Sequence, residues 1–328
     1  MHSRIRAGML MACLAVSGSS EMDARAAVAV ATTNHLGWSD AWVVSNGQVE
    51  AVVVPAVGRV MQFRWCGATQ GPFWENPQLA GKPMPEAPWT ASHGSFGGDK
   101  TWPAPQSLWS WPPPDVFDAA AVEARVEDGA LRLISGVSPR FGIRTERRVV
   151  VPTGGSSMAI ETTYHKVSGD PVTVGVWVIT QMADPVAVYV PVPKGSRFAS
   201  GTSALWGASP PAVSRQGDLL RLTRDTANSY KVGNDGTAML WVGATELLRI
   251  DIPRVAGGAY ADDGCSVEVY SNPDPVPYME LETLGVQRRL AAGDTVSATN
   301  TYTLFRRQSA DEAAEVRRAL APGGAATP

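Results

Sequence analysis

The sequence predicts an all-β fold, a large β-sandwich with one short C-terminal helix. Glycine (32) and proline (25) are frequent among the 328 residues, and only 18% of the residues are charged. This composition favours many turns over long helices. Short segments with the two-residue periodicity of strands recur between these turns along most of the chain.

The strands are predicted in chain order from this alternation. Asn46-Gly47 separates residues 41–45 from residues 48–55, which is a strong signal for a two-residue hairpin. Residues 61–65 alternate apolar and polar side chains, as in a half-buried strand. Further strands are predicted at residues 122–126, 131–135, 144–151, 158–165, 172–180, 219–222, 238–242, 248–252, 267–270, 278–284 and 295–305.

The two ends of the chain differ from this pattern. Ser309 and Glu312 have the spacing of a helix capping box, so a helix is predicted to follow and to end before Gly323. At the other end, two arginines precede the apolar residues 7–16, and Ala24-Arg25-Ala26 offers a cleavage site, as in a signal peptide. An uncleaved leader and a lipoprotein signal at Cys13 are the alternatives.

The predicted organisation has three parts. They are a signal peptide (1–26), one β-sandwich domain (27–306), and a C-terminal helix with a disordered tail (307–328). We therefore expect a periplasmic or secreted protein. An oxidising compartment would permit a bridge between Cys66 and Cys265, but two free buried thiols are the favoured expectation.

Composition and spacing argue against several classes of partner. The net charge is −3 without any run of Lys or Arg, which disfavours nucleic acid, and no apolar run has the length of a membrane span. No closely spaced His/Cys set is present for zinc, so we expect no metal and no cofactor. Asp225 and Asp262-Asp263 leave a weak signal for calcium.

The predicted strand 278–284 carries the first candidate site. Glu280 and Glu282 would lie on one face of this strand, because side chains alternate between faces. Neighbouring carboxylates repel unless water, a cation or a ligand lies between them, and one pKa can rise into the range of a general base. The alternative is an ordinary solvated face of the sheet.

Residues 97–115 carry the second candidate site. They hold three tryptophans and five prolines, and we predict a loop because proline removes a backbone donor and fixes φ. Flat aromatic rings together with a few polar groups suit a sugar. We expect Asp99, Lys100 and Trp102 to face the ligand, whereas Trp109 and Trp111 pack to hold the loop.

Several segments resemble the galactose mutarotase (aldose 1-epimerase) superfamily. The C-terminal resemblance comes from Leu281-Glu282-Thr283, Ala292-Gly293-Asp294 and Tyr302-Thr303-Leu304-Phe305. Residues 158–182 resemble the paired central strands of that fold. The resemblance implies a β-supersandwich with a groove of carbohydrate size.

A narrower resemblance is carried by the ten residues Gly97-Gly98-Asp99-Lys100-Thr101-Trp102-Pro103-Ala104-Pro105-Gln106. Together with Glu75-Asn76-Pro77 and the strand of Glu280 and Glu282, this segment resembles an uncharacterised bacterial family of that superfamily, domain of unknown function 4380. The family implies no established activity. The candidate ligand contacts are Trp102, Asp99, Lys100, Arg59, Glu75, Asn76 and Gln106; Arg59 would suit an anionic sugar such as a uronate.

The superfamily resemblance also implies catalytic roles. Glu282 matches the base that removes a proton from the anomeric hydroxyl, with Glu280 beside it. His93 resembles one of two family histidines, but residues 175–182, where the second would stand, contain none, so Lys100 or Asp99 would have to supply the acid.

Three function classes follow from these observations. The first is an exported protein that binds carbohydrate, the second a mutarotase or epimerase that uses Glu282 as its base, and the third a structural component of the envelope. A carbohydrate is the expected partner in the first two.

Overall fold

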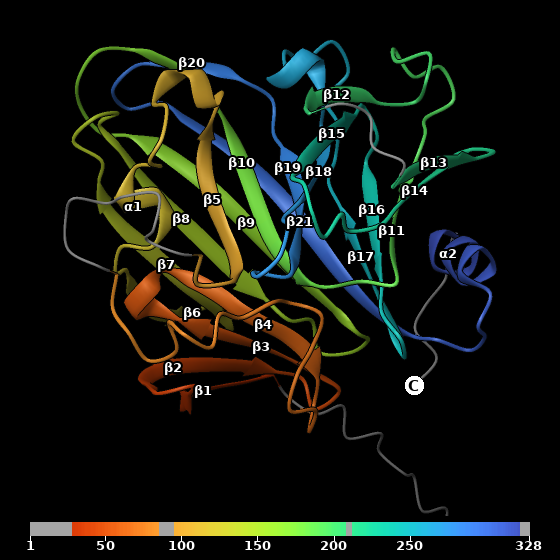
Figure 1. The fold of residues 1–328 in the computed structure, drawn as a ribbon. Helices are drawn as coiled ribbons and strands as arrows, with labels where there is room; N and C mark the ends of the chain where they lie inside the picture. The colour runs from red at the N-terminus through yellow and green to blue at the C-terminus, as the bar shows by residue number, and fades with distance from the viewer. Residues whose placement is uncertain (1–27, 85–94, 208–211, 322–328) are drawn as a thin grey trace, which may run out of the picture.

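The computed structural model describes residues 28–84, 95–207 and 212–321. Two antiparallel sheets of eleven and ten strands pack against each other, and a short helix lies near the C-terminus (Figure 1). The prediction of an all-β supersandwich with one short C-terminal helix is confirmed. The predicted leader (1–26) lies outside the described residues.

The eleven-stranded sheet combines strands from the whole length of the chain. In spatial order it consists of β1 (Ala29–His35), β2 (Trp38–Ser45), β3 (Val49–Val54), β4 (Arg59–Trp65), β5 (Gly98–Ala104), β10 (Val172–Ala183), β19 (Tyr278–Leu284), β18 (Val267–Ser271), β15 (Tyr230–Asn234) and β12 (Ser203–Trp206), with β20 (Arg288–Leu290) also pairing with β10.

The ten-stranded sheet covers one face of the larger sheet. Its spatial order is β13 (Val213–Gln216), β14 (Leu219–Leu222), β11 (Ala187–Pro191), β16 (Ala238–Val242), β17 (Glu246–Asp251), β21 (Thr295–Arg306), β9 (Ser157–Lys166), β8 (Ile143–Val150), β7 (Ala130–Val137) and β6 (Glu123–Glu127).

The main core lies between the two sheets. Phe63 and Leu281 from the larger sheet belong to one buried cluster with Ile160 and Leu304 from the smaller sheet. Burial of such side chains contributes roughly 1.5–3 kcal/mol each. Strands β5 and β19 are buried along their full length. Their other face must therefore also be covered, and that face holds the site described below.

Residues 98–104 form strand β5, so the predicted loop is wrong over these residues. β5 pairs with β10 along its length, with Pro103 opposite Val176, but with β4 only at Asp99. Pro103 is tolerated because no second ladder runs beside it, as for a proline on an edge strand. The four later prolines of the run lie outside strands, and Pro112, Pro113 and Pro114 directly precede the short helix α1 (Asp115–Asp118).

The structure also corrects the pairing suggested for residues 158–182. β9 belongs to the smaller sheet and β10 to the larger, so the connection between them crosses from one sheet to the other. β9 pairs with β8 and β21 instead.

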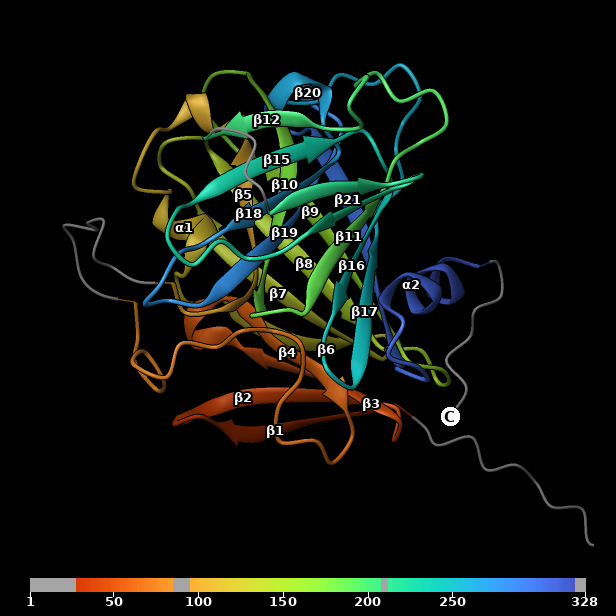
Figure 2. The same cartoon turned by 45° about the vertical axis from the view of Figure 1, so that its right-hand side comes forward.

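The C-terminal helix α2 (Glu312–Leu320) begins at a different cap from the predicted one. The Asp311 side chain, rather than that of Ser309, accepts a hydrogen bond from the backbone N–H of Ala314 at 3.0 Å. Val316 and Ala319 pack with Phe305 of β21, and Figure 2 shows α2 beside the smaller sheet.

Two further expectations concern the cysteines and the membrane. Cys66 and Cys265 are free thiols, but only Cys265 is buried and Cys66 is half-buried, so the expectation of two buried thiols is wrong for Cys66. Burial raises the pKa of the Cys265 thiol. Among the residues with described positions, no helix combines the length and the apolar character that crossing a membrane requires.

A buried ionic contact joins the two sheets at β5. The Asp99 carboxylate pairs with Arg147 of β8 and accepts hydrogen bonds from the hydroxyls of Thr180 (2.6 Å) and Tyr302 (2.5 Å). Asp99 and Arg147 are both almost fully buried. Each charge therefore depends on the other for stabilisation.

We predict that Asp99→Asn lowers the free energy of unfolding by about 3 kcal/mol, because the Arg147 guanidinium would stay buried without a countercharge. Urea unfolding followed by circular dichroism measures this change. Asp170→Asn, at an exposed position, serves as the control and should change stability by less than about 0.5 kcal/mol. Equal stability of the two variants would contradict this role of Asp99.

Candidate functional site

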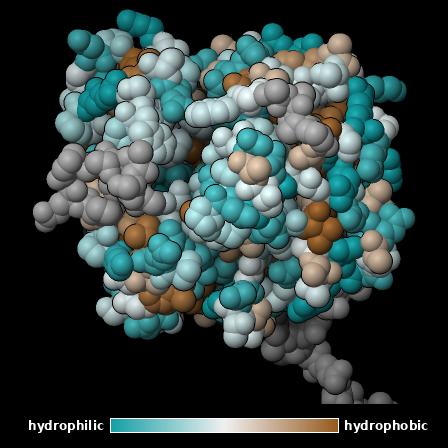
Figure 3. All heavy atoms as spheres, viewed as in Figure 1, coloured by the Kyte–Doolittle hydropathy of each residue, from teal (hydrophilic) through white to brown (hydrophobic). Residues whose placement is uncertain are grey.

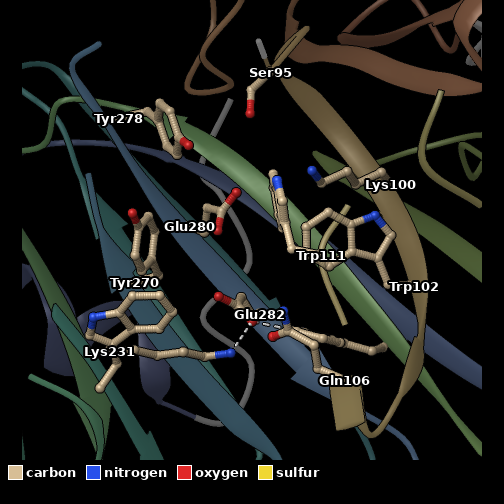
Figure 4. Close-up of a pocket in the computed structure, with 12 residues that line it drawn as sticks. Ser95, Lys100, Trp102, Gln106, Trp111, Lys231, Tyr270, Tyr278, Glu280 and Glu282 are labelled. Carbon is tan, nitrogen blue, oxygen red and sulfur yellow. Dashed lines mark hydrogen bonds and ion pairs between the residues drawn. The ribbon is translucent and has the colours of Figure 1, made fainter. Parts of the chain in front are cut away.

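A pocket of about 330 Å³ lies on the face of the larger sheet that is turned away from the smaller sheet (Figure 4). Its volume is within the range of small-molecule sites. Four charged side chains and six aromatic rings line it together with two small polar residues: Lys100, Lys231, Glu280, Glu282, Trp102, Trp111, Trp177, Trp206, Tyr270, Tyr278, Ser95 and Gln106.

The register of the strands brings these residues together. Ile179 of β10 lies opposite Lys100 of β5 on one side and opposite Glu282 of β19 on the other. Glu282 in turn lies opposite Glu268 of β18. Side chains opposite one another in neighbouring strands are about 5 Å apart, so this row concentrates charge on one face of the sheet.

Glu282 is held by two donors. Its Oε2 accepts a hydrogen bond from Trp177 Nε1 at 2.7 Å and lies 2.9 Å from Lys231 Nζ. Lys231 Nζ also lies 2.5 Å from Glu268 Oε2. Burial alone would lower the pKa of Lys231, but these two carboxylates outweigh it and raise that pKa, whereas burial raises the pKa of Glu268. Glu282 is thus fixed in position by β10 and β15.

Lys100 belongs to a second ionic cluster. Its Nζ lies 3.1 Å from Asp118 Oδ1, which also accepts a hydrogen bond from Trp102 Nε1 at 2.8 Å. Burial raises the pKa of Asp118, but Lys100 and Arg59 more than offset this and bring it to about 2. Burial lowers the pKa of Lys100. The ammonium also lies 4.0 Å from the centre of the Trp102 ring, a cation–π contact.

Glu280 has a different environment. Its Oε1 accepts a hydrogen bond from Gln181 Nε2 at 2.9 Å. Burial, reinforced by the charge of Glu282, raises the pKa of Glu280 to about 7, although Lys100 and the Gln181 bond oppose the rise. A carboxyl group with such a pKa can accept or release a proton near neutral pH.

Of the tryptophans in residues 102–111, two line the pocket and one packs behind them. Trp102 contacts the rings of Trp109, Trp111 and Trp177 edge-on, at centroid distances of 5.4, 6.3 and 5.3 Å. Trp109 is buried and donates to the carbonyl of Pro103, which is the packing role expected of it. Trp111 lines the pocket and is 50% exposed, so assigning it to packing alone was wrong.

The structure corrects the placement of four predicted contacts, because none of them is among the described residues that line the pocket. Asp99 points to the opposite face of β5, toward the other sheet, since side chains alternate along a strand. Arg59 lies behind the pocket, where its guanidinium pairs with Asp118 at 3.1 Å. The Glu75 carboxylate pairs with His35 at 2.5 Å, and the Asn76 amide donates to the Ser95 carbonyl at 2.8 Å.

Of the other predicted site residues, Glu280, Glu282, Lys100, Trp102 and Gln106 line the pocket, and His93 lies outside the described residues. The residues that were missed from the sequence are Ser95, Trp177, Trp206, Lys231, Tyr270 and Tyr278. Two of these follow from alternation along a strand. Trp177 lies on the same face of β10 as Gln181, and Tyr278 lies on the same face of β19 as Glu280 and Glu282. Tyr270 lies opposite Glu280, which depends on the register of β18 against β19.

The described residues contain no group of three or more His, Cys, Asp or Glu side chains that could hold a metal ion. The acidic residues that gave a weak calcium signal, Asp225, Asp262 and Asp263, therefore form no such group.

Comparisons with known proteins bear on the fold. No model of a protein family matches the sequence, and no protein with a curated description matches it. The structure is similar to a galactose mutarotase-like protein from Lactobacillus casei, with a TM-score of 0.54 and 10% identity over 80% of this chain and 99% of that one. It is also similar to a putative mutarotase from Salmonella typhimurium. That comparison has a TM-score of 0.53 and 11% sequence identity, over 85% of this chain and 97% of the other.

A TPR-domain-containing protein from Parabacteroides distasonis gives a TM-score of 0.56 at 11% identity, over 80% of this chain. The match spans less than half of that protein, 46% of its length. The chain therefore has a galactose mutarotase-like fold, and these identities establish the fold alone.

The raised pKa of Glu280 predicts a pH-dependent stability. Its value of about 7 in the folded protein exceeds the ordinary 4.5, so its stabilising contribution is present below about pH 4.5 and is lost as the pH rises through 7. Between pH 4.5 and 7.5, the free energy of unfolding should therefore fall by up to ~3 kcal/mol relative to Glu280→Gln. Urea unfolding at both pH values measures it.

Glu161→Gln, at an exposed position on β9, is the matched control and should show no comparable trend. If the difference between Glu280→Gln and the parent protein stays constant with pH, Glu280 titrates like an ordinary carboxyl group and the account of its environment is wrong.

Proposed function

We propose that this protein binds carbohydrate in the pocket on the outer face of the larger sheet. The observation that carries the proposal is the composition of this pocket, in which six aromatic rings surround four charged side chains held in place by hydrogen bonds and ion pairs. Sugar rings present apolar C–H faces to aromatic rings and hydroxyls to polar groups. The fold neighbours named as mutarotase-like support the same class of ligand.

We also propose that the protein is exported, with residues 1–26 as the signal peptide, and that it belongs to the family described as domain of unknown function 4380. The pattern of residues 1–26 and the unusual segment Gly97–Gln106 support these two statements. The third class, a structural envelope component, has less support. On the face seen in Figure 3, hydrophobic residues form small separate spots rather than a broad apolar surface.

A sugar mutarotase or epimerase is the second candidate, favoured by the contrast between Glu280 and Glu282. In mutarotation a base takes the proton of the anomeric hydroxyl and an acid protonates the ring oxygen, so that the ring opens and closes again. Glu282, with Lys231 and Trp177 on one oxygen, would be the base. Glu280, which titrates near neutral pH, or Lys100 would be the acid.

Binding predicts a specific effect of the exposed tryptophan. Trp111→Ala should weaken sugar affinity about tenfold, or ~1.4 kcal/mol, because the stacking surface for the sugar ring is lost. Titration calorimetry with a panel of aldoses and uronates measures it. Val126→Ala removes an exposed apolar side chain from β6 and is the control. Full affinity in Trp111→Ala would make this ring irrelevant to the ligand.

Catalysis predicts faster exchange between anomers. Exchange NMR on freshly dissolved aldoses would show acceleration by the protein, and Glu282→Gln should reduce this acceleration at least about 100-fold, as expected for loss of a general base. Binding without any acceleration by the unmodified protein would remove the enzyme candidate and leave the binding proposal intact.

A further inference from the structure

The charges around the pocket do not balance. Four carboxyl groups face three cationic groups among the described residues that form the pocket and its two ionic clusters; they are Asp118, Glu268, Glu280 and Glu282 against Arg59, Lys100 and Lys231. With every group ionised, this set carries one excess negative charge. A proton or a cation from outside the set must neutralise it, because an uncompensated buried charge is costly.

Among these carboxyl groups, Glu280 is the one at which a ligand in the pocket could neutralise the excess negative charge. Asp118 contacts both Arg59 and Lys100, and Lys231 contacts both Glu282 and Glu268. Glu268 does not line the pocket, whereas Glu280 does, and within the described part of the chain Glu280 has no ion pair. Among the residues that the structure describes, the hydrogen bond that Glu280 accepts comes from a neutral amide, that of Gln181.

The surroundings of Glu280 suit a cation. Figure 4 shows its carboxylate between the rings of Tyr270 and Tyr278 on one side and the Trp111 indole on the other. The centres of the two tyrosine rings are 6.5 Å apart. Aromatic faces beside a carboxylate attract ammonium groups through the ring quadrupole as well as through the ion pair. An anionic sugar would meet the unpaired carboxylate, and Arg59 lies behind the pocket.

We propose that the ligand carries a positively charged amino group, as an amino sugar with a free amine does, and that this group lies beside Glu280 between Tyr270, Tyr278 and Trp111. The inference rests on the proposed carbohydrate-binding function. It adds the class of sugar and makes Glu280 the residue that determines specificity.

Calorimetry of the full protein with three matched series tests the inference: glucosamine, galactosamine and mannosamine, their N-acetyl forms, and their neutral parent hexoses. We expect at least one amine to bind tenfold or more tightly than its N-acetyl and neutral counterparts. In Glu280→Gln this ratio should fall to about one, and in Glu161→Gln it should persist. An amine that binds no better than its neutral counterparts overturns the inference and leaves the proposed function standing.

If no sugar of any series binds, the proposed function and this inference both fail. Two measurements cover the possibility that Glu280→Gln does not fold. Tyr270→Leu should reduce the preference for the amine, and Tyr270→Phe should keep it. In the unmodified protein, affinity for the amine should rise about fivefold from pH 6 to pH 7, as the ionised fraction of Glu280 increases while the amine stays largely protonated. A flat profile contradicts the role of Glu280.

Discussion

The contact on which the rest of this structure depends is the buried ion pair between Asp99 of β5 and Arg147 of β8. It ties the larger sheet to the smaller one at β5, a strand whose ladder with β4 consists of a single residue pair. Because side chains alternate along β5, fixing Asp99 toward the core fixes Lys100 and Trp102 toward the pocket. The wall of the pocket is therefore set by an interaction on the opposite face of the sheet.

Most charged groups of the pocket are already engaged in ion pairs with other residues of the protein. Lys100 is held by Asp118, and Lys231 is held by Glu282 and Glu268. These contacts make both lysines rigid parts of the wall rather than free cations that await an anionic ligand. Glu280 differs from these groups, because its hydrogen-bond donor is the neutral amide of Gln181. We therefore expect the ligand to place a positively charged group beside the Glu280 carboxylate.

The sequence was most informative where alternation is regular. Strands β14, β16 and β19 were predicted to the residue, and the shared face of Glu280 and Glu282 follows from β19 alone. Strand β5 was not predicted, because prolines in its segment are typical of a loop, although β5 forms one continuous ladder with β10. Strand β15 was not predicted either, because Gly233 and Asn234 weaken its alternation, so Lys231 was not recognised as a site residue. The roles of Asp99 and Arg59 could not be read from sequence, because their partners Arg147 and Asp118 lie far away in the chain.

The residues of the site could be predicted only in part, because they too come from segments that lie far apart in the chain. Trp102 and Lys100 could be proposed from one unusual segment, but the aromatic rings opposite them come from β10, β12, β18 and β19. The order of these strands in the sheet, not their order in the sequence, makes them neighbours.

Carbohydrate binding in this pocket can be tested by a crystal structure of the protein with the tightest-binding sugar of the calorimetric panel. We expect a sugar ring in the pocket, stacked on Trp111 or Trp102, with polar contacts to Glu280 and Glu282. A sugar bound at full occupancy elsewhere on the molecule, with this pocket empty, would contradict it.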